Sequence, residues 1–282
     1  KVTATTDRRK VLKGADAVLV TILCGQTSVW QHDILIPKKY GIDINVGDTR
    51  GPSGIFRALR TIPTMLAICR DMEELCPNAI MLNYTNPMAM LCHAMQRETS
   101  IKVTGLCHSV QGTSHQLAGY ANVPYEELKW KCGGINHLAW FTELSHNGKS
   151  IYPLLQKSIL KDKELLAKDP VRFDIMKHFG YFVTESSGHF SEYLPYYRKR
   201  KDLIEKHCGT GYLGQSSFYA DNWPTWRQNN DQYRKDVISG KQPLELNRTW
   251  EYASHIIEAV EANKPFVAHL TVPNNGLISN LP

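Results

Sequence analysis

The stretch Ile101-Lys-Val-Thr-Gly-Leu-Cys-His-Ser-Val-Gln-Gly-Thr113 runs from an apolar segment through polar residues into the start of a helical pattern. Apolar and β-branched residues that end at a polar turn are typical of a buried strand. The stretch therefore predicts a strand over 101–106 and a helix over 113–120. A strand that passes directly into a helix is the repeating unit of parallel α/β folds.

The same alternation of strand and helix patterns precedes this stretch. We expect Asp7 to cap the first helix, because an aspartate at that position can accept a backbone hydrogen bond. Alternating strands and helices favour a parallel sheet, so the first 150 residues predict an α/β domain. The further strands are expected over 2–6, 17–23, 80–83 and 266–272, and the further helices over 8–13, 55–75 and 89–97.

Polar side chains follow two neighbouring strands of the predicted sheet. Asn83 and Asn86 stand at the end of one strand, and Cys107 stands at the end of the next. Open α/β sheets bind ligands outside the carboxyl ends of their strands. We therefore expect these three side chains to line one crevice.

Cys107 and His137, in Gly133-Gly-Ile-Asn-His137, are candidate metal ligands. A thiolate and an imidazole suit a first-row divalent cation, and two protein ligands leave positions open for substrate oxygens. Such a metal acts as a Lewis acid rather than as a structural brace. On spacing alone, a buried thiol and a satisfied core histidine remain the alternative interpretation.

The pattern changes after about residue 150. Helices are expected over 157–168, 170–179 and 248–262, and an aromatic loop over 218–226. The last residues, Asn274-Asn-Gly-Leu-Ile-Ser-Asn-Leu-Pro282, close no helix, so we expect the chain to be a fragment of a longer protein. We divide it into residues 1–135 and 136–282.

Composition narrows the class of protein. Hydrophobic residues make up 42% of the chain and charged residues 21%, and no apolar run reaches 18 residues, so we expect no membrane span. The net charge of +6 and the short basic run Arg198–Lys201 indicate a solvated helix end rather than a nucleic-acid surface. Seven cysteines, an odd number, and the lack of a visible secretory signal favour a reducing compartment, the cytoplasm.

Several blocks together resemble family-4 glycoside hydrolases, and within them the α-galactosidase (melibiase) branch. Two further segments, 181–193 and 274–282, extend the match over nearly the whole chain, in order. The main blocks are Gly47-Asp-Thr-Arg-Gly-Pro-Ser-Gly54 with the nine residues after it, Asn83-Tyr-Thr-Asn-Pro-Met-Ala89, Gly105-Leu-Cys-His-Ser-Val-Gln-Gly112 and Gly134-Ile-Asn-His137.

The resemblance implies an enzyme that hydrolyses α-galactosides with NAD⁺ and Mn²⁺, outside the usual two-carboxylate scheme. In such enzymes NAD⁺ takes a hydride from carbon 3 of the sugar, which acidifies the proton on carbon 2. A base removes that proton, the aglycone leaves carbon 1, water adds, and the hydride returns. The metal stabilises the negative charge that develops on the sugar oxygens.

The resemblance also implies residue roles. Cys107 and His137 match the metal ligands, and Asn86 matches a substrate-binding asparagine. His108 stands where related enzymes place a proton donor to the leaving group; phospho-sugar branches have aspartate there, so His108 suggests a non-phosphorylated sugar.

Tyr193 matches a tyrosine proposed as the base, and Glu185 is the reserve candidate. As a base, Tyr193 needs a pKa lowered from about 10 by metal or cationic charge. His108 alternatively holds Cys107 in place, and Tyr193 is alternatively a packing aromatic. Glu185 and His189 read more readily as supporting residues than as catalytic ones.

The implied fold is a Rossmann-like parallel sheet without its N-terminal strands, followed by a truncated α+β domain like that of family-4 glycosidases and lactate dehydrogenases. The glycine-rich turn and the acidic residue that bind the dinucleotide are absent, so no cofactor-binding residue is assigned. We expect a homo-oligomer, a dimer or tetramer, in the full-length form. The alternatives are an α-glucosidase or α-galacturonidase of the same family, a 2-hydroxy-acid dehydrogenase, and an inactive product or interaction module.

Overall fold

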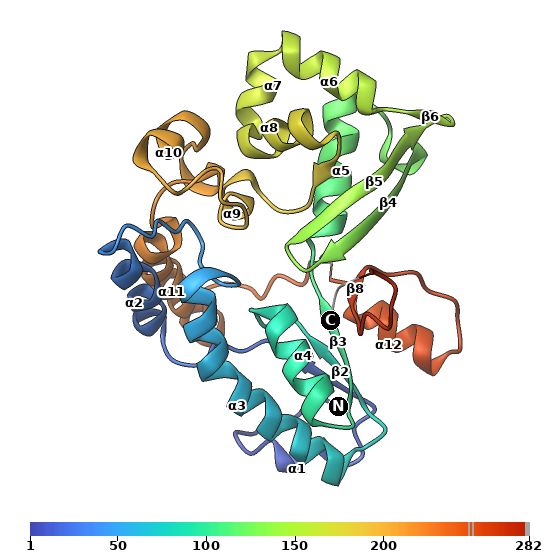
Figure 1. The fold of residues 1–282 in the computed structure, drawn as a ribbon. Helices are drawn as coiled ribbons and strands as arrows, with labels where there is room; N and C mark the ends of the chain where they lie inside the picture. Colours follow the sequence, from blue (N-terminus) through green and yellow to red (C-terminus); the bar gives the residue numbers. More distant parts are fainter. Residues whose placement is uncertain (248, 250, 280–282) are drawn as a thin grey trace. The chain divides into compact units, whose positions relative to one another are not determined.

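The computed structural model describes residues 1–247, 249 and 251–279 (Figure 1). The chain forms two compact units. The first unit contains residues 1–24, 54–107 and the described part of 251–282, and the second contains 25–53 and the described part of 108–250. Each unit therefore gathers segments that are far apart in the sequence.

A four-stranded sheet with the order β1-β2-β3-β8 forms the centre of the first unit. The first three strands are parallel, and β8 runs antiparallel beside β3. Val20 pairs with Asn83 and Asn83 pairs with Gly105, so the carboxyl ends of three strands are level. This sheet confirms the predicted α/β class. The strands are β1 Ala17–Val20, β2 Ile80–Asn83, β3 Lys102–Leu106 and β8 Leu270–Thr271.

Helices cover both faces of this sheet. Met81 is buried among side chains of α3 and α4, whereas the next residue, Leu82, is buried against α12. Because successive strand residues point to opposite faces, β2 contributes to two separate cores. The helices of this unit are α1 Arg9–Leu12, α3 Gly51–Leu75 (whose first three residues belong to the second unit), α4 Met88–Glu98 and α12 Ala253–Glu261.

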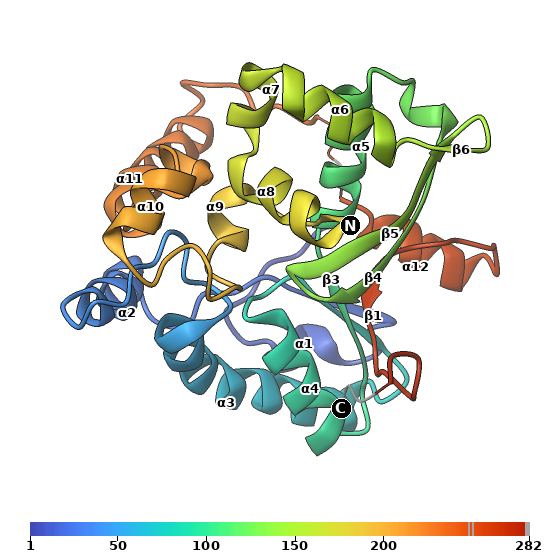
Figure 2. The same ribbon diagram turned by 45° about the horizontal axis from the view of Figure 1, so that its top comes forward.

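A long hairpin of β4 and β5 is the main sheet element of the second unit and lies beside α5 and α6 (Figure 2). Both β6 and β7 pair with β5. Phe141 and Leu144 of β5 are buried in a core that α5, α6, α7 and α8 complete. The strands are β4 Leu128–Ile135, β5 Leu138–His146, β6 Lys149–Ser150 and β7 Phe182–Val183.

Helices of the second unit contribute to the hairpin core and to a second buried cluster that contains Phe190, Tyr193 and Tyr197. Among the residues that the structure describes, no helix has both the length and the apolar character of a membrane span. The helices are α2 Thr27–Lys38, α5 Ser109–Ala121, η1 Tyr125–Glu127, α6 Tyr152–Lys161, α7 Lys163–Lys168, α8 Pro170–Phe179, α9 Ser187–Phe190, α10 Lys201–His207, η2 Gly211–Leu213 and α11 Phe218–Ile238.

Two sequence expectations are wrong. Residues 2–6 form no strand, and the expected aromatic loop at 218–226 is the first part of the helix α11. Its aromatic rings contact α2: the ring centroid of Trp30 lies 5.5 Å from that of Tyr219 and 5.6 Å from that of Trp223. Packing against α2 thus stabilises a helix through a Pro-containing stretch that reads locally as a loop.

Other element boundaries shift for local reasons. The expected helix 157–168 is two helices, because the Asp162 carboxylate accepts the backbone N–H groups of Glu164 and Leu165 and so begins α7. The helix expected from 248 is described only from Ala253; Arg248, Trp250 and the terminal residues 280–282 lie outside the described residues. The expected Asp7 cap is displaced by one residue: Arg8 is the N-cap of α1, and the Asp7 carboxylate accepts the backbone N–H of Arg9 at 3.1 Å.

Gly134 allows the β4–β5 hairpin to close. Its φ is 148°, and a Cβ atom added there would lie 2.5 Å from the carbonyl oxygen of Leu138 and 2.7 Å from the Cα atom of Ala139. Both neighbours are backbone atoms on the paired strand, so a side chain at this position would force the strands apart. At the adjacent Gly133, an added Cβ has no atom within 4 Å.

We predict that Gly134→Ala lowers the free energy of unfolding by about 1–3 kcal/mol, because it combines a strained backbone with a steric clash. Gly133→Ala is the matched control and should stay within about 0.5 kcal/mol of the parent protein. Urea unfolding followed by tryptophan fluorescence measures both. Equal midpoints for the two variants would show that the hairpin does not need the glycine.

Candidate functional site

His137 occupies the tight turn of the β4–β5 hairpin. Ile135 of β4 pairs with Leu138 of β5, so only Asn136 and His137 connect the strands. The φ of His137 is 63°, in the left-handed region that few residues other than glycine adopt. Because His137 is buried, the contacts of its side chain can hold the backbone in this unfavourable conformation.

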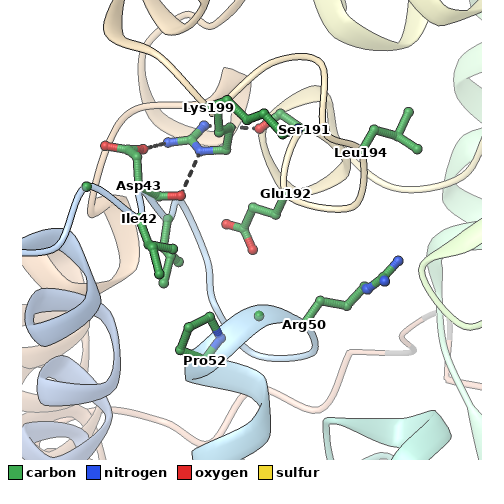
Figure 3. Close-up of a pocket in the computed structure, with 12 residues that line it drawn as sticks. Ile42, Asp43, Arg50, Pro52, Ser191, Glu192, Leu194 and Lys199 are labelled. Carbon is green, nitrogen blue, oxygen red and sulfur yellow. Dashed lines mark hydrogen bonds and ion pairs between the residues drawn. The ribbon is translucent and has the colours of Figure 1, made fainter.

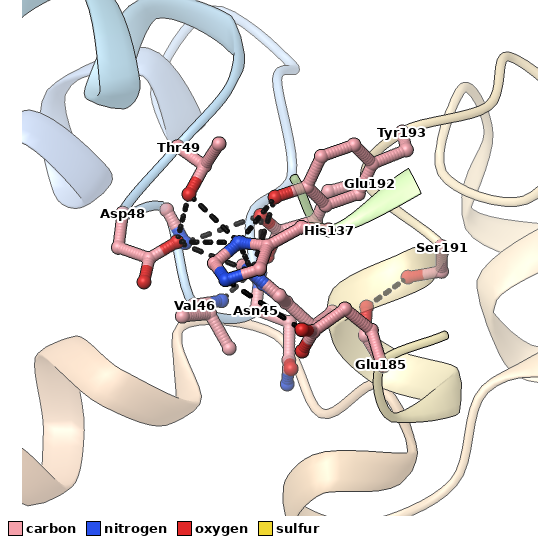
Figure 4. A network of polar contacts seen from close by, with 12 residues as sticks. Asn45, Val46, Asp48, Thr49, His137, Glu185, Ser191, Glu192 and Tyr193 are labelled. Carbon is pink, nitrogen blue, oxygen red and sulfur yellow. Dashed lines mark hydrogen bonds and ion pairs between the residues drawn. The ribbon is translucent and has the colours of Figure 1, made fainter. Parts of the chain in front are cut away.

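Polar atoms from two distant segments surround the Nδ1 atom of His137 (Figure 4). The hydroxyl oxygen of Thr49 lies 3.0 Å away, and that of Tyr193 lies 3.1 Å away. The Nε2 atom of His189 is also 3.1 Å from this nitrogen. The other ring nitrogen of His137, Nε2, lies 3.5 Å from the Glu185 carboxylate. The two nitrogens of one imidazole therefore face two different polar environments.

Asp48 joins this group from the side of His189. Its Oδ1 atom lies 3.2 Å from the Nε2 atom of His189 and 4.0 Å from the Nδ1 atom of His137. The same oxygen accepts the hydroxyl of Thr49 at 2.7 Å. We call Asp48, Thr49, His137, His189 and Tyr193 the histidine cluster. The ligand atoms of its aspartate and two histidines all lie within 4.8 Å of one another.

Burial and charge set the proton affinities of the histidine cluster. Burial acts to lower the pKa of His189, but the charge and hydrogen bond of Asp48 outweigh it and leave this pKa above its usual value. Burial raises the pKa of the Tyr193 hydroxyl well above its usual value, and the negative charges of Asp48 and Glu185 add to this rise. Tyr193 can therefore act as a base only with positive charge nearby.

A buried ion pair holds the segment that carries Glu185 and His189. The guanidinium of Arg172 is bidentate on Asp169 and also donates to Thr113 and Gln116 of α5. Asp169 in turn accepts the hydroxyl of Ser187, the first residue of α9. Such a fully hydrogen-bonded charge pair fixes α5, α8 and the start of α9 relative to one another.

Glu192 holds the other loop of the histidine cluster. Its carboxylate accepts the backbone N–H groups of Asn45, Val46 and Gly47, the residues just before Asp48. Gly47 has a φ of 70°, and a Cβ there would lie 2.7 Å from the hydroxyl of Ser53, so the loop needs glycine at this point.

A cavity of about 300 Å³ lies beside this loop (Figure 3). Arg50 lines it, and its guanidinium carbon is 5.6 Å from the ring centroid of Tyr193. Arg198 also lines it but is buried and paired with Asp43. The basic run that the sequence suggested to be a solvated helix end is therefore exposed only from Lys199 onward.

The structure brings three of the predicted site residues together: His137, Glu185 and Tyr193. His108 also belongs to the second unit, where it precedes the first turn of α5. Cys107 and Asn86 belong to the first unit, at the ends of the neighbouring strands β3 and β2, as the strand-end argument predicts.

Both residues of the first unit have local backbone contacts. The Tyr252 hydroxyl donates to the carbonyl of Cys107 and accepts its N–H, both at 3.0 Å. The amide oxygen of Asn86 accepts the N–H of Met88 at 3.2 Å, and its carbonyl accepts the Nε–H of Arg57 at 3.0 Å. These contacts fix the backbone that carries the two side chains.

Asp48 and Thr49 were not singled out from the sequence, and His189 was weighed only as a supporting residue. Asp48 and Thr49 stand in the quoted block 47–54, but nothing local marks them as neighbours of His137, which is 89 residues from Asp48 and 88 from Thr49. One signal was available: His189 and Tyr193 are four residues apart, the spacing that places side chains on one face of a helical turn.

Known proteins resemble this chain over almost all of its length. An α-galactosidase of Bacillus subtilis is 41% identical over 98% of this chain, which spans 63% of that relative. The crystal structure of lplD from Bacillus subtilis is 28% identical, with a TM-score of 0.82, covering 99% of this chain and 68% of that one. The Thermotoga maritima 6-phospho-β-glucosidase structure with manganese, NAD⁺ and glucose 6-phosphate is 21% identical, with a TM-score of 0.72, over 99% of this chain and 63% of that one.

Two family models match consecutive parts of the sequence. Residues 1–123 match the family 4 glycosyl hydrolases, and residues 132–282 match the C-terminal domain of the same family. Together with the α/β fold and the buried histidine cluster, these matches show that the chain belongs to family 4 of the glycosyl hydrolases.

Proposed function

We propose that this chain provides the site of a glycosidase that cleaves α-galactosides by oxidation, elimination, addition and reduction. The observation that carries the proposal is the buried contact of His137 with Tyr193 and Glu185 in a family-4 chain that is 41% identical to the α-galactosidase of Bacillus subtilis. Removing a proton from the carbon next to a carbonyl group requires a base and a nearby Lewis acid. Here a candidate base lies beside a candidate metal ligand.

The donor atoms suit a divalent first-row metal, which we assign to Cys107 and His137. On His137, the Nε2 atom lies 3.5 Å from the carboxylate of Glu185, which is a further oxygen donor for a cation. We therefore assign the metal to Nε2. When bound, Mn²⁺ supplies Lewis-acid stabilisation of negative charge on sugar oxygens. The 6-phospho-β-glucosidase of Thermotoga maritima, which shares the fold, was determined with manganese and NAD⁺.

The parallel sheet of the first unit is the proposed place of NAD⁺, which supplies uptake and return of a hydride. Its strands end level at Val20, Asn83 and Gly105, the edge where dinucleotides lie in such sheets. No glycine-rich phosphate-binding turn occurs in residues 1–282, so we assign no residue to the pyrophosphate. The division into a dinucleotide-binding part, 1–135, and a substrate part, 136–282, remains part of this proposal.

Tyr193 is the proposed base that removes the proton from carbon 2. Its hydroxyl lies 3.1 Å from both His137 and His189, which hold it in place. Burial raises its pKa, so cationic charge at His137 must lower it before the phenol can lose its proton. His108 is the proposed proton donor to the leaving group, and Asn86 the proposed ligand of a sugar hydroxyl.

Glu185 remains the second candidate for the base. Its φ of 76° is in the left-handed region, a conformation that for a non-glycine residue is often retained at functional sites. Its carboxylate faces the nitrogen to which we assign the metal, so removing its charge would also weaken metal binding. A base role and a metal-supporting role predict different kinetics.

The proposed substrate and the proposed cellular compartment rest on separate observations. His108 in place of an acidic residue favours a non-phosphorylated sugar, and the α-galactosidase relative favours galactose over glucose or galacturonate. All seven cysteines are free thiols, which supports a reducing compartment such as the cytoplasm. A homo-oligomer remains our prediction for the full-length form.

We predict release of nitrophenol from nitrophenyl α-galactoside only when NAD⁺, Mn²⁺ and a thiol reductant are all present. The α-glucoside and α-galacturonide should react more slowly.

Cys107→Ser should abolish the Mn²⁺-dependent rate because a hydroxyl is a far poorer anionic ligand than a thiolate. Cys132→Ser, at a thiol of similar exposure on β4, is the matched control and should retain it. Net NADH formation from a hydroxy acid without glycoside cleavage would favour a 2-hydroxy-acid dehydrogenase. Failure of the protein to bind NAD⁺ would favour an inactive product or interaction module.

We predict that Tyr193→Phe lowers the turnover rate by ~10²–10⁴-fold, the usual effect of losing a general base, with little change in substrate binding. The ring stays in place, so the loss reports on the hydroxyl. Glu185→Gln should be milder and should respond to added Mn²⁺. Steady-state kinetics over a range of Mn²⁺ concentrations separate the two. A severe, Mn²⁺-insensitive loss in Glu185→Gln with near-normal Tyr193→Phe would reverse the assignment.

A further inference from the structure

The Nδ1 face of His137 has more polar neighbours than hydrogen bonding can use. A ring nitrogen of histidine carries either one N–H group or one lone pair. Yet Nδ1 of His137 has Thr49, Tyr193 and His189 atoms at 3.0, 3.1 and 3.1 Å. The Nε2 atom of His189 is equally crowded, with His137, Tyr193 and Asp48 atoms at 3.1, 3.1 and 3.2 Å.

The spacing of these atoms fits a common metal centre. The three ligand atoms of Asp48, His137 and His189 are separated by 3.1, 3.2 and 4.0 Å. A point at about 2 Å from all three exists, which is the distance of zinc from histidine nitrogen and carboxylate oxygen. The Tyr193 hydroxyl, 3.1 Å from both histidine nitrogens, lies where a fourth ligand belongs.

The far side of His189 supports the same arrangement. Its Nδ1 atom is buried and has no hydrogen-bond partner among the residues that the structure describes, and a carboxylate oxygen of Glu192 is 3.8 Å away. Histidines that bind a metal through one nitrogen commonly orient the other toward a carboxylate. A small rotation of the His189 ring would complete that contact.

We propose that Asp48, His137 and His189 form a second metal site, for a zinc-class divalent ion, on the Nδ1 face of His137. It shares only His137 with the manganese site of the proposed function, and because a neutral imidazole has a single nitrogen lone pair, His137 binds one of the two ions at a time. Nitrogen and carboxylate ligands without a thiolate suit Zn²⁺ or Co²⁺. The existence of this site does not rest on the proposed reaction. Its consequence does: an ion here holds His137 and the Tyr193 hydroxyl, so it inhibits the enzyme.

Cobalt absorption tests the proposal directly on the purified protein without substrate. Co²⁺ bound to imidazole and carboxylate gives visible bands without the near-ultraviolet charge-transfer band of a cobalt thiolate, which marks a site containing Cys107. We expect Co²⁺ to bind Cys107→Ser without a thiolate band and to be displaced by Zn²⁺, because the thiolate of the manganese site is absent from this variant. Added to Cys107→Ser, His189→Ala and Asp48→Asn should each weaken this binding by at least about tenfold.

His178→Ala removes a histidine on the exposed end of α8 and is the matched control, expected to bind like the parent protein. Asp48→Asn keeps the side-chain shape, so it tests the site even if His189→Ala fails to fold. Absence of Co²⁺ binding in Cys107→Ser, or unchanged binding when Asp48→Asn is added to it in a folded protein, would overturn the proposal and leave a hydrogen-bonded cluster only. Loss of glycosidase activity alone would not bear on these metal titrations.

Discussion

The carboxylate of Glu192 joins the two loops on which the histidine cluster depends. It accepts three backbone N–H groups from Asn45, Val46 and Gly47, directly before Asp48, while its own segment carries His189 and Tyr193. Hydrogen bonds to a carboxylate are about twice as strong as neutral ones, and three to one side chain leave the loop little freedom. This contact holds the loop of Asp48 against the segment of His189 and Tyr193.

Burial gives the cluster its chemical character. Removed from water, Tyr193 retains its proton, whereas Asp48 favours the charged form of His189 despite burial. Unpaired buried charges are strongly destabilising, so the surroundings must satisfy them. The buried charges of Arg172 and Asp169 satisfy each other in a bidentate pair. Through Ser187, this pair also holds the start of α9. A cation at His137 would then change the proton affinity of Tyr193 through a short, poorly screened distance.

The sequence predicts correctly those elements whose conformation depends on neighbouring residues in the chain. The apolar runs before Asn83 and Cys107 gave two strands and their shared edge, because periodicity and turn residues mark both. The helical state of 218–226 could not be read locally, since it depends on Trp30 of α2. The same holds for the neighbours of His137: Thr49 and Tyr193 meet it only through long-range packing. The roles of Cys107 and Asn86 came from resemblance and stay predictions.

Solvent exchange at carbon 2 of the sugar tests the central claim most directly, because only an elimination route loses that proton. Hydrolysis of an α-galactoside in deuterated water, with the product examined by mass spectrometry and proton NMR, measures it. The account predicts that the galactose formed carries solvent deuterium at carbon 2. Complete hydrolysis with carbon 2 wholly unlabelled would contradict it and would indicate direct displacement at carbon 1.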